Sequence, residues 1–360
     1  MRNGTKEMKH IVIFRFLRFL IIFFSFSTLL AEEGNITPYK FSFDEKGPLP
    51  TYTPPSSCTF SVARPQKDAP AITFYFSKPS NKSYPIAFFC TGSSSKESLY
   101  SIIHMHRFFL KEFLELGVGL VTCEQWGMDA ATIDADMFMR HYTRTQRLQD
   151  HRNVIEYLQK HPPQGWNGKL IFVGVSEGGS LVTALTIAYA DQTLATVNWS
   201  GADGWAWRDE LWAFIDGMHL FESPPWHIRL RARLPQWFPG SLKKEFPRTR
   251  RDYDALMDKT YKNPTFEKFF MGMTYAYHAD ALQWPATEYQ QIRSPYLVVA
   301  GDLDTAIRSE DAFVEYAKQA GVNITYMRLK NVGHQVARLP EVIEQSFVWL
   351  RSVLENTPVK

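Results

Sequence analysis

The chain alternates between short apolar runs and longer segments in which apolar and polar positions mix. Continuous apolar runs of the kind buried on both faces of a parallel sheet occur at 84–90, 117–123 and 169–175. Earlier runs, separated by proline-rich turns, predict leading antiparallel strands at 39–43, 58–62 and 71–76. The pattern therefore predicts a mostly parallel sheet that is preceded by an antiparallel edge.

Helices are predicted between these strands. A capping-box pattern at Ser94 and Glu97 opens a helix over 97–116. A second helix over 140–159 places His151 on one face with three aliphatic residues, which indicates a core histidine rather than a catalytic one. A further helix through Leu181 and Ile187 follows the run at 169–175, and a strand follows it at 194–202. This alternation predicts an α/β fold with a doubly wound parallel sheet.

The pattern breaks from Asp203 to about Gln291. This stretch has no evident strand, reads as several short helices, and contains six tryptophans: Trp205, Trp207, Trp212, Trp226, Trp237 and Trp284. Strand patterns return in SPYLVVAGDLD and ITYMRLKNVGH, and an amphipathic helix over 339–354 closes the sequence. We therefore interpret the break as a helical insertion that covers the sheet as a cap.

The first 31 residues resemble a signal peptide. Five basic residues precede or border an uncharged apolar run at 19–30, which is too short to span a bilayer, and Ala31 stands before two glutamates. We expect cleavage near Ala31 and export, to the periplasm or the medium. An uncleaved membrane anchor is the alternative, and the lack of a cysteine after the run argues against a lipoprotein.

Composition narrows the function classes. A chain of 360 residues that is 45% hydrophobic suits one large α/β core with an insertion, or two domains. The net charge of +3, from 40 basic and 37 acidic side chains, disfavours a nucleic-acid binder. Three cysteines are too few for a disulfide scaffold. The sequence holds no metal-ligand or nucleotide-binding motif, so no cofactor or metal is implied. His104 and His106 are two positions apart on a predicted helix and point to different faces, which argues against a metal ion shared between them.

The stretch LIFVGVSEGGSL carries the strongest chemical motif. A strand that turns sharply into a helix needs glycine where a Cβ would clash, and Ser176 between Gly174 and Gly178 would be lifted out of such a turn. This is the pattern of a nucleophile elbow. By itself the motif is also compatible with an ordinary glycine-rich turn.

A serine nucleophile needs an imidazole to take its proton and a carboxylate to orient that imidazole. Asp304 follows the strand that ends at Ala300, and His334 follows the last predicted strand. Both lie in loops at the carboxyl ends of strands, where open α/β sheets place their chemistry. Ser176, Asp304 and His334 are therefore the candidate catalytic residues.

With these motifs, the chain resembles an α/β-hydrolase-fold serine hydrolase with a cap. The resemblance selects Asp304 over Asp302, and Asp203 is the position that would serve in members with the acid one strand earlier. It implies an oxyanion hole from the backbone N–H of Glu177 and one N–H from Gly92 or Ser93, where Thr91-Gly92 replaces the usual histidine-glycine. The implied division is a signal peptide, a first core part, a cap and a second core part, at 1–31, 32–202, 203–290 and 291–360.

Two features admit two interpretations each. Cys90 and Cys123 end strands that the family places side by side, so they either form a disulfide or fill space as small apolar side chains. The basic run at 227–251 is either a solvated face or a surface that attracts anionic substrates or a membrane surface.

We therefore expect an exported, cofactor-independent serine hydrolase that acts on a small-molecule acyl substrate, with a carboxylic ester as the default. A serine peptidase or aminopeptidase of the same fold is the enzymatic alternative, because a second glycine after the elbow, here Gly179, also occurs in prolyl-oligopeptidase-like relatives. A non-catalytic binding protein on this fold is the alternative of another class. The oligomeric state is left open.

Overall fold

The computed structural model describes residues 35–43, 49–216, 230, 234, 246–247 and 249–356. The predicted signal peptide and most of the basic run lie outside these residues. Within the described part of the chain, no helix combines the length and apolarity needed to cross a membrane.

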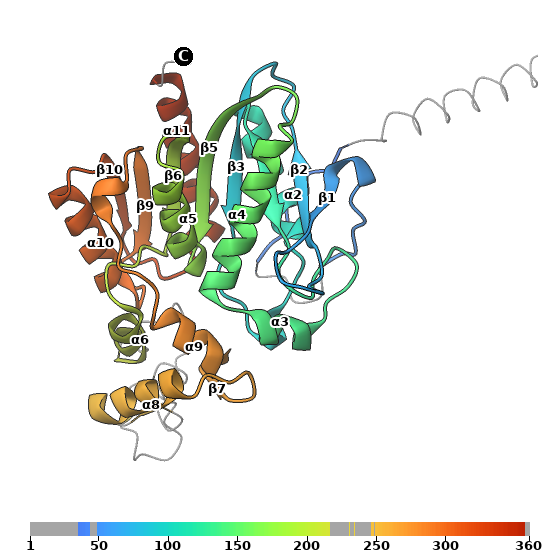
Figure 1. Cartoon of the computed structure of the whole chain (residues 1–360). Helices are drawn as coiled ribbons and strands as arrows, with labels where there is room; N and C mark the ends of the chain where they lie inside the picture. The colour runs from blue at the N-terminus through green and yellow to red at the C-terminus, as the bar shows by residue number, and fades with distance from the viewer. Residues whose placement is uncertain are drawn as a thin grey trace, which may run out of the picture.

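An eight-stranded sheet forms the centre of the fold, in the order β1-β2-β4-β3-β5-β6-β9-β10 (Figure 1). The strands are β1 (Thr59–Val62), β2 (Ile72–Ser77), β3 (Tyr84–Cys90), β4 (Gly119–Cys123), β5 (Trp166–Val175), β6 (Thr193–Trp199), β9 (Tyr296–Gly301) and β10 (Ile324–Leu329). β2 is antiparallel to both of its neighbours, and all other pairs are parallel. The predicted α/β fold with an antiparallel edge is confirmed.

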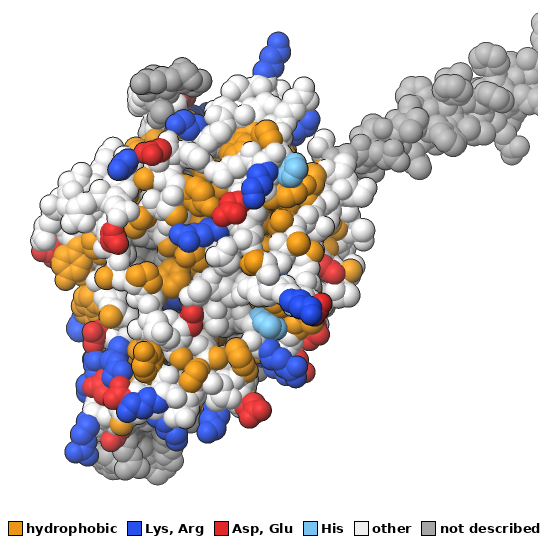
Figure 2. Space-filling model, viewed as in Figure 1, with side chains coloured by type: hydrophobic (Ala, Val, Ile, Leu, Met, Phe, Trp, Pro, Cys, Tyr) orange, Lys and Arg blue, Asp and Glu red, His pale blue; other side chains and the backbone are white. Residues whose placement is uncertain are grey.

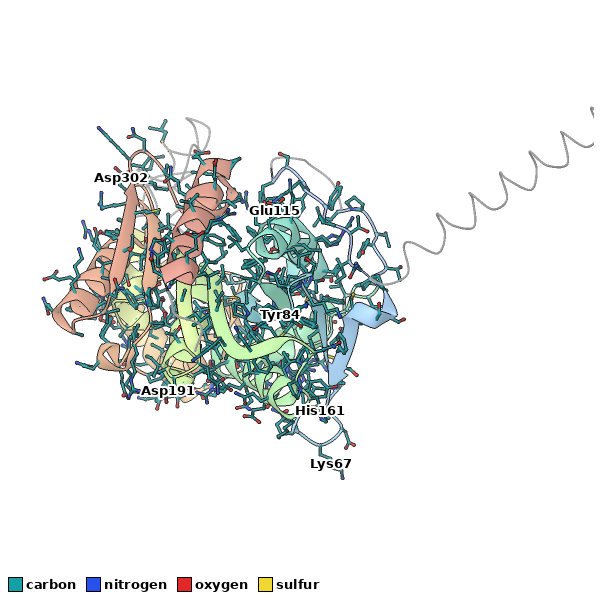
Figure 3. All side chains as sticks on the ribbon, turned by 90° about the horizontal axis from the view of Figure 1, so that it is seen from above. Lys67, Tyr84, Glu115, His161, Asp191 and Asp302 are labelled. Carbon is teal, nitrogen blue, oxygen red and sulfur yellow. The ribbon has the colours of Figure 1, made fainter. Side chains whose placement is uncertain are left out.

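Helices cover both faces of the sheet. α2 (Ile103–Glu115) and α11 (Pro340–Asn356) pack on one face, whereas α4 (Arg144–Lys160), α5 (Glu177–Ala188) and α10 (Ile307–Gln319) pack on the other. The period-two alternation of a strand explains this arrangement, because Ile171 and Val173 contact the first group while Leu170 and Phe172 contact the second. Seen from above, Figure 3 shows Tyr84 inside this layered body and Lys67 projecting from it.

Three predicted elements differ from the structure. Residues 39–43 form no strand, because the N–H of Tyr39 donates to the carbonyl of Arg107 on α2, 3.0 Å away, instead of to a neighbouring strand. The helix predicted over 97–116 begins only at Ile103, as α2, and its predicted start forms a separate 3-10 turn, η2 (Lys96–Ser98), whose capping box is Ser95 with Ser98. The helix predicted from 140 is split into α3 (Ala135–His141) and α4, since the Thr143 side chain caps a new helix start.

The segment between β6 and β9 holds α6 (Trp207–Asp216), α8 (Arg250–Lys262) and α9 (Tyr275–Ala281), with the short pair β7 (Phe269–Phe270) and β8 (Met273–Thr274). These elements gather at one end of the sheet (Figure 1). They have an apolar cluster of their own, which includes Leu211 of α6 and Tyr253 and Met257 of α8. The domain boundaries of this segment stay a prediction.

Basic and acidic side chains alternate on the surface of this segment. Figure 2 shows them side by side over α8. Arg250, in the basic run, pairs with Asp209 at 2.6 Å and with Asp254 at 3.0 Å, and the three side chains are 39%, 55% and 35% exposed. In the described part of the basic run, this arginine therefore belongs to a solvated ion-pair network of small energetic value.

His106 on α2 is fully buried, and both of its ring nitrogens form hydrogen bonds. Its Nε2 lies 2.9 Å from Ser77 Oγ, and its Nδ1 lies 3.0 Å from Thr122 Oγ1. Burial lowers the pKa of His106 to about 3. The imidazole is therefore a neutral hydrogen-bonding link between α2 and the sheet.

We expect His106 to make the protein less stable in acid. An unfolded histidine takes up a proton near its ordinary pKa, whereas folded His106 does so only near pH 3, so the free energy of unfolding falls as the pH drops between these values. One such group contributes a slope of up to about 1.4 kcal/mol per pH unit. Urea unfolding of His106→Gln between pH 4 and 7 should show a slope lower by about this amount. The exposed His161→Asn is the control, and an unchanged slope in His106→Gln would contradict the expectation.

Candidate active site

Ser176 lies at the turn between β5 and α5 and has a left-handed backbone, with φ 53° and ψ −128°. Its N–H donates to the carbonyl of Trp199 at 2.8 Å, and its carbonyl accepts the N–H of Gly179 at 2.7 Å. Such a backbone costs about 1–3 kcal/mol in a residue with a Cβ, so the surrounding structure must hold it. The turn lifts the serine hydroxyl out of the chain path.

Gly174 and Gly178, on either side of Ser176, are needed because neighbouring backbone segments approach each other too closely here to leave room for a side chain. A Cβ on Gly174 would overlap the carbonyl of Gly178, and one on Gly178 would overlap the carbonyl of Cys90 at the end of β3. The motif is therefore a packing requirement of the strand-to-helix turn.

The structure brings together the three side chains that the sequence analysis selected. Ser176 Oγ lies 2.8 Å from His334 Nε2, and His334 Nδ1 lies 2.7 Å from Asp304 Oδ2. The Asp304 side chain is fully buried, while that of His334 is 35% exposed. Asp304 Oδ1 also accepts the N–H of Ala306 at 2.9 Å, which fixes the carboxylate. One continuous hydrogen-bonded chain thus ends on the serine hydroxyl.

The two other carboxylates considered for the acid have different partners. Asp203 accepts from Arg144, 3.0 Å away, and from the hydroxyl of Ser180. Asp302 accepts the N–H of Asn331 at 2.7 Å.

The expected oxyanion-hole residues surround the serine. Glu177 is the first residue of α5, so its N–H has no partner within the helix. A Cβ on Gly92 would lie 3.0 Å from Ser176 Cβ and 3.5 Å from Ser176 Oγ, so the loop after β3 passes directly beside the hydroxyl. Ser93 lines the same pocket as Ser176.

This pocket has a volume of about 540 Å³ and opens beside Ser176 and His334. Apolar and aromatic side chains from the segment between β6 and β9 form much of its wall: Trp207, Leu211, Phe214, Met271, Met273 and Tyr277. It has the size and lining of a small-molecule site. Within the described residues, no group of His, Cys, Asp and Glu has the arrangement of a metal site.

Sequence reasoning missed a buried network around the side chain of Glu177. Arg147 Nη1 donates to Glu177 Oε1 at 2.6 Å, and the hydroxyls of Tyr142 and Tyr277 donate to the same carboxylate. Arg147 Nη2 also donates to the carbonyl of Thr91 at 2.6 Å. Burial, and then the Glu177 charge, raise the pKa of Tyr142 and Tyr277 well above the ordinary tyrosine value, so both act as donors. The network links α4 and α9 to the residue after Ser176.

A pattern in the sequence could have revealed part of this network. Arg144, Arg147 and His151 are spaced by three and four along α4 and are all buried. Arginines that repeat on the apolar face of a helix need buried acceptors. Which carboxylates would meet them depends on contacts between distant segments.

Cys90 and Cys123 are free, buried thiols, so the disulfide interpretation is wrong for this structure. Cys90 Sγ instead lies 3.4 Å from Nε2 of His151. Burial, and then the charge of Arg147, lower the pKa of His151 to about 3. His151 is thus a neutral histidine of the core, as its helical spacing indicated.

Removing Arg147 should destabilise the fold strongly. The Arg147 and Glu177 side chains are 6% and 4% exposed, so Arg147→Met leaves a buried carboxylate without its counter-ion. We expect a loss of about 3–5 kcal/mol in the free energy of unfolding, measured with urea. Arg147→Met combined with Glu177→Gln should be the more stable of the two variants.

The matched control is Arg328→Met, which breaks the exposed pair with Asp311, 46% and 42% exposed, and should cost about 1 kcal/mol or less. Similar losses for Arg147→Met and Arg328→Met would show that the buried pair has no special weight.

The chain is similar to known proteins in sequence and in structure. A family model described as alpha/beta hydrolase fold matches residues 145–338, more than half of the chain. Among solved structures, a carboxyl esterase from Bacillus coagulans has a TM-score of 0.52 at 14% identity, over 82% of this chain and 97% of that one. A proline iminopeptidase from Mycobacterium smegmatis has a TM-score of 0.52 at 15% identity, over 82% and 97%.

Est1E from Butyrivibrio proteoclasticus, solved with ferulic acid, has a TM-score of 0.50 at 15% identity, over 81% of this chain and 96% of that one. No curated protein matches the sequence. At these identities the structural likeness shows the fold, and the family match covers the elbow, Asp304 and His334. The chain therefore belongs to the family of hydrolases with the alpha/beta hydrolase fold.

Proposed function

We propose that the protein is a serine hydrolase that cleaves an acyl bond, with a carboxylic ester as the default substrate. The observation that carries the proposal is the unbroken contact chain from Asp304 through His334 to Ser176 Oγ, with 2.7 and 2.8 Å between the bonded atoms. Ser176 is the proposed nucleophile, His334 the general base and acid, and Asp304 the group that orients the imidazole.

The proposed reaction has two halves. Ser176 Oγ attacks the carbonyl carbon while His334 Nε2 takes the hydroxyl proton, and the resulting oxyanion accepts N–H donors of Glu177 and of Gly92 or Ser93. When the intermediate collapses, His334 returns the proton to the leaving alkoxide. Water, activated by the same imidazole, then releases the acid from the acyl-enzyme. Asp304 Oδ2 accepts a hydrogen bond from Nδ1–H of His334 throughout and stabilises the imidazolium.

An ester is the default because an alcohol leaves more readily than an amine. The segment 203–290 is proposed as a cap, since its α6 and α9 side chains wall the pocket beside Ser176. The esterases and the proline iminopeptidase named above share the fold, so a peptidase is the second candidate.

Ser176→Ala should abolish covalent labelling by a fluorophosphonate, because the reagent traps an activated serine hydroxyl. Gel fluorescence of the labelled wild type and variant measures this. Ser95→Ala, in the loop after β3, is the control and should label like the wild type. Labelling that persists in Ser176→Ala would refute the nucleophile, and an unlabelled wild type would favour a non-catalytic binding protein.

His334→Ala should lower kcat for p-nitrophenyl butyrate by about 10⁴-fold or more, and Asp304→Asn by about 10³- to 10⁴-fold, because triad members act as a unit. Asp203→Asn should cost less than Asp304→Asn, since Asp203 contacts Arg144 and Ser180. Steady-state kinetics of the three variants gives the comparison. If Asp203→Asn proved the more damaging carboxylate change, the role of the acid would pass to Asp203.

A further inference from the structure

The pocket beside Ser176 has an excess of carboxylates. Asp203, Glu210 and Glu310 line it together, and Arg144 is the one lysine or arginine that lines it among the described residues. Arg144 is already paired with Asp203, 3.0 Å away. Among the described residues neither Glu210 nor Glu310 forms a salt bridge, but the charge of Arg144 acts on Glu210 as well as on Asp203. Glu310 therefore faces the pocket without a cation, and Glu210 shares one with Asp203.

Glu310 is the more unusual of the two. It lies in the first turn of α10, is 1% exposed, and neither of its carboxylate oxygens has a hydrogen-bond partner among the described residues. Burial, and then the charges of Asp304 and Glu210, raise its pKa well above the ordinary value. A buried carboxyl without donors or counter-ion is unfavourable, so a donor from a ligand or from water would stabilise it.

The local structure holds these groups at the pocket wall. Ser309, beside Glu310, accepts the N–H of Gly204 at 3.0 Å and donates to Glu210 Oε2 at 3.2 Å. This hydroxyl therefore ties α6 and the loop after β6 to α10. The Glu210 carboxylate is thus held by a hydrogen bond, and Glu310 is held by burial in the first turn of α10, which favours a preorganised subsite.

The hydrogen-bond acceptors that line the pocket indicate which kind of ligand it can bind. Glu310 offers two unpartnered oxygens, and Ser200 Oγ, also without a partner among the described residues, lines the same pocket. Together with Glu210, they come from three different elements. A primary ammonium carries one positive charge and three diverging N–H donors, which suits such a set, whereas a quaternary ammonium has no donor to offer.

We propose that Glu310 and Glu210 form a subsite for a primary ammonium group of the substrate. The inference rests on the proposed function, because it names the class of acyl substrate that Ser176 would attack: an ester or amide with a free amino group. Burial raises the pKa of both carboxyls, so a bound cation would favour their ionised form and satisfy the unpartnered oxygens at the same time. An amine-bearing substrate is also the class in which the ester and peptidase candidates overlap.

Binding can be measured without catalysis. In the Ser176→Ala protein, isothermal titration calorimetry should give benzylammonium about tenfold or more higher affinity than benzyl alcohol or benzyltrimethylammonium. Adding Glu310→Gln, or separately Glu210→Gln, should remove most of this preference. The matched control is Glu315→Gln, an exposed glutamate of the same helix, which should keep it.

Equal affinities for benzylammonium and benzyl alcohol would overturn the subsite, as would a preference that both carboxylate variants retain. A stronger affinity for the trimethyl compound would overturn the assignment to a primary ammonium and would favour recognition by the aromatic wall.

Inhibition kinetics separates this inference from the proposed function. In the wild type, benzylammonium should inhibit p-nitrophenyl butyrate hydrolysis competitively, with an inhibition constant about tenfold below that of benzyl alcohol. If the wild type hydrolyses no ester and does not label, but Ser176→Ala still prefers benzylammonium, the proposed function fails and the subsite stands. If the wild type hydrolyses the ester but no preference for the ammonium is found, the subsite fails and the hydrolase stands.

Discussion

The close approach of backbones around Ser176 is the constraint on which the rest of the site depends. The start of α5 lies against the end of β3 so tightly that a side chain at Gly178 would occupy the carbonyl of Cys90. The same contact sets the left-handed turn at Ser176 and brings the loop at Gly92 beside its hydroxyl. Because contacts with the ends of β3 and β6 hold this turn, the packing of the sheet stabilises its strained backbone.

Helix α4 has a second, electrostatic role. Arg144 and Arg147 lie one turn apart and reach two carboxylates of the pocket that Ser176 lines, Asp203 at 3.0 Å and Glu177 at 2.6 Å. One helix thus balances two negative charges, of which that of Glu177 is buried and that of Asp203 is partly buried. Glu310 receives no such compensation from the described residues, and the contrast within one pocket is what makes it informative.

The sequence supports prediction of the fold and of the central site residues for a clear reason. Strands buried on both faces leave continuous apolar runs, and Asp304 follows such a run in β9. His334 follows β10, a partly buried strand at the edge of the sheet. Where local patterns compete, prediction failed: the serines of 93–95 offered several caps, and Thr143 broke a helix that periodicity alone would continue. The Glu177 network was out of reach, because Tyr277 is 100 positions away from its partner. Burial of the two arginines of α4 is likewise decided by contacts that local patterns do not encode.

The position of β6 beside β9 has a consequence for how the protein comes together. These neighbours in the sheet are separated by the whole segment that contains α6, α8 and α9. The chain before that segment carries Ser176, and the chain after it carries Asp304 and His334. The hydrogen-bonded chain from Asp304 through His334 to Ser176 cannot form until β6 and β9 have paired, with Asn198 opposite Val298. Contacts of such large sequence separation are costly to close and tend to form slowly. During biosynthesis, Ser176 would therefore lack the partners that its proposed role needs until nearly the entire polypeptide had been made, so any activity would begin only after translation is almost complete.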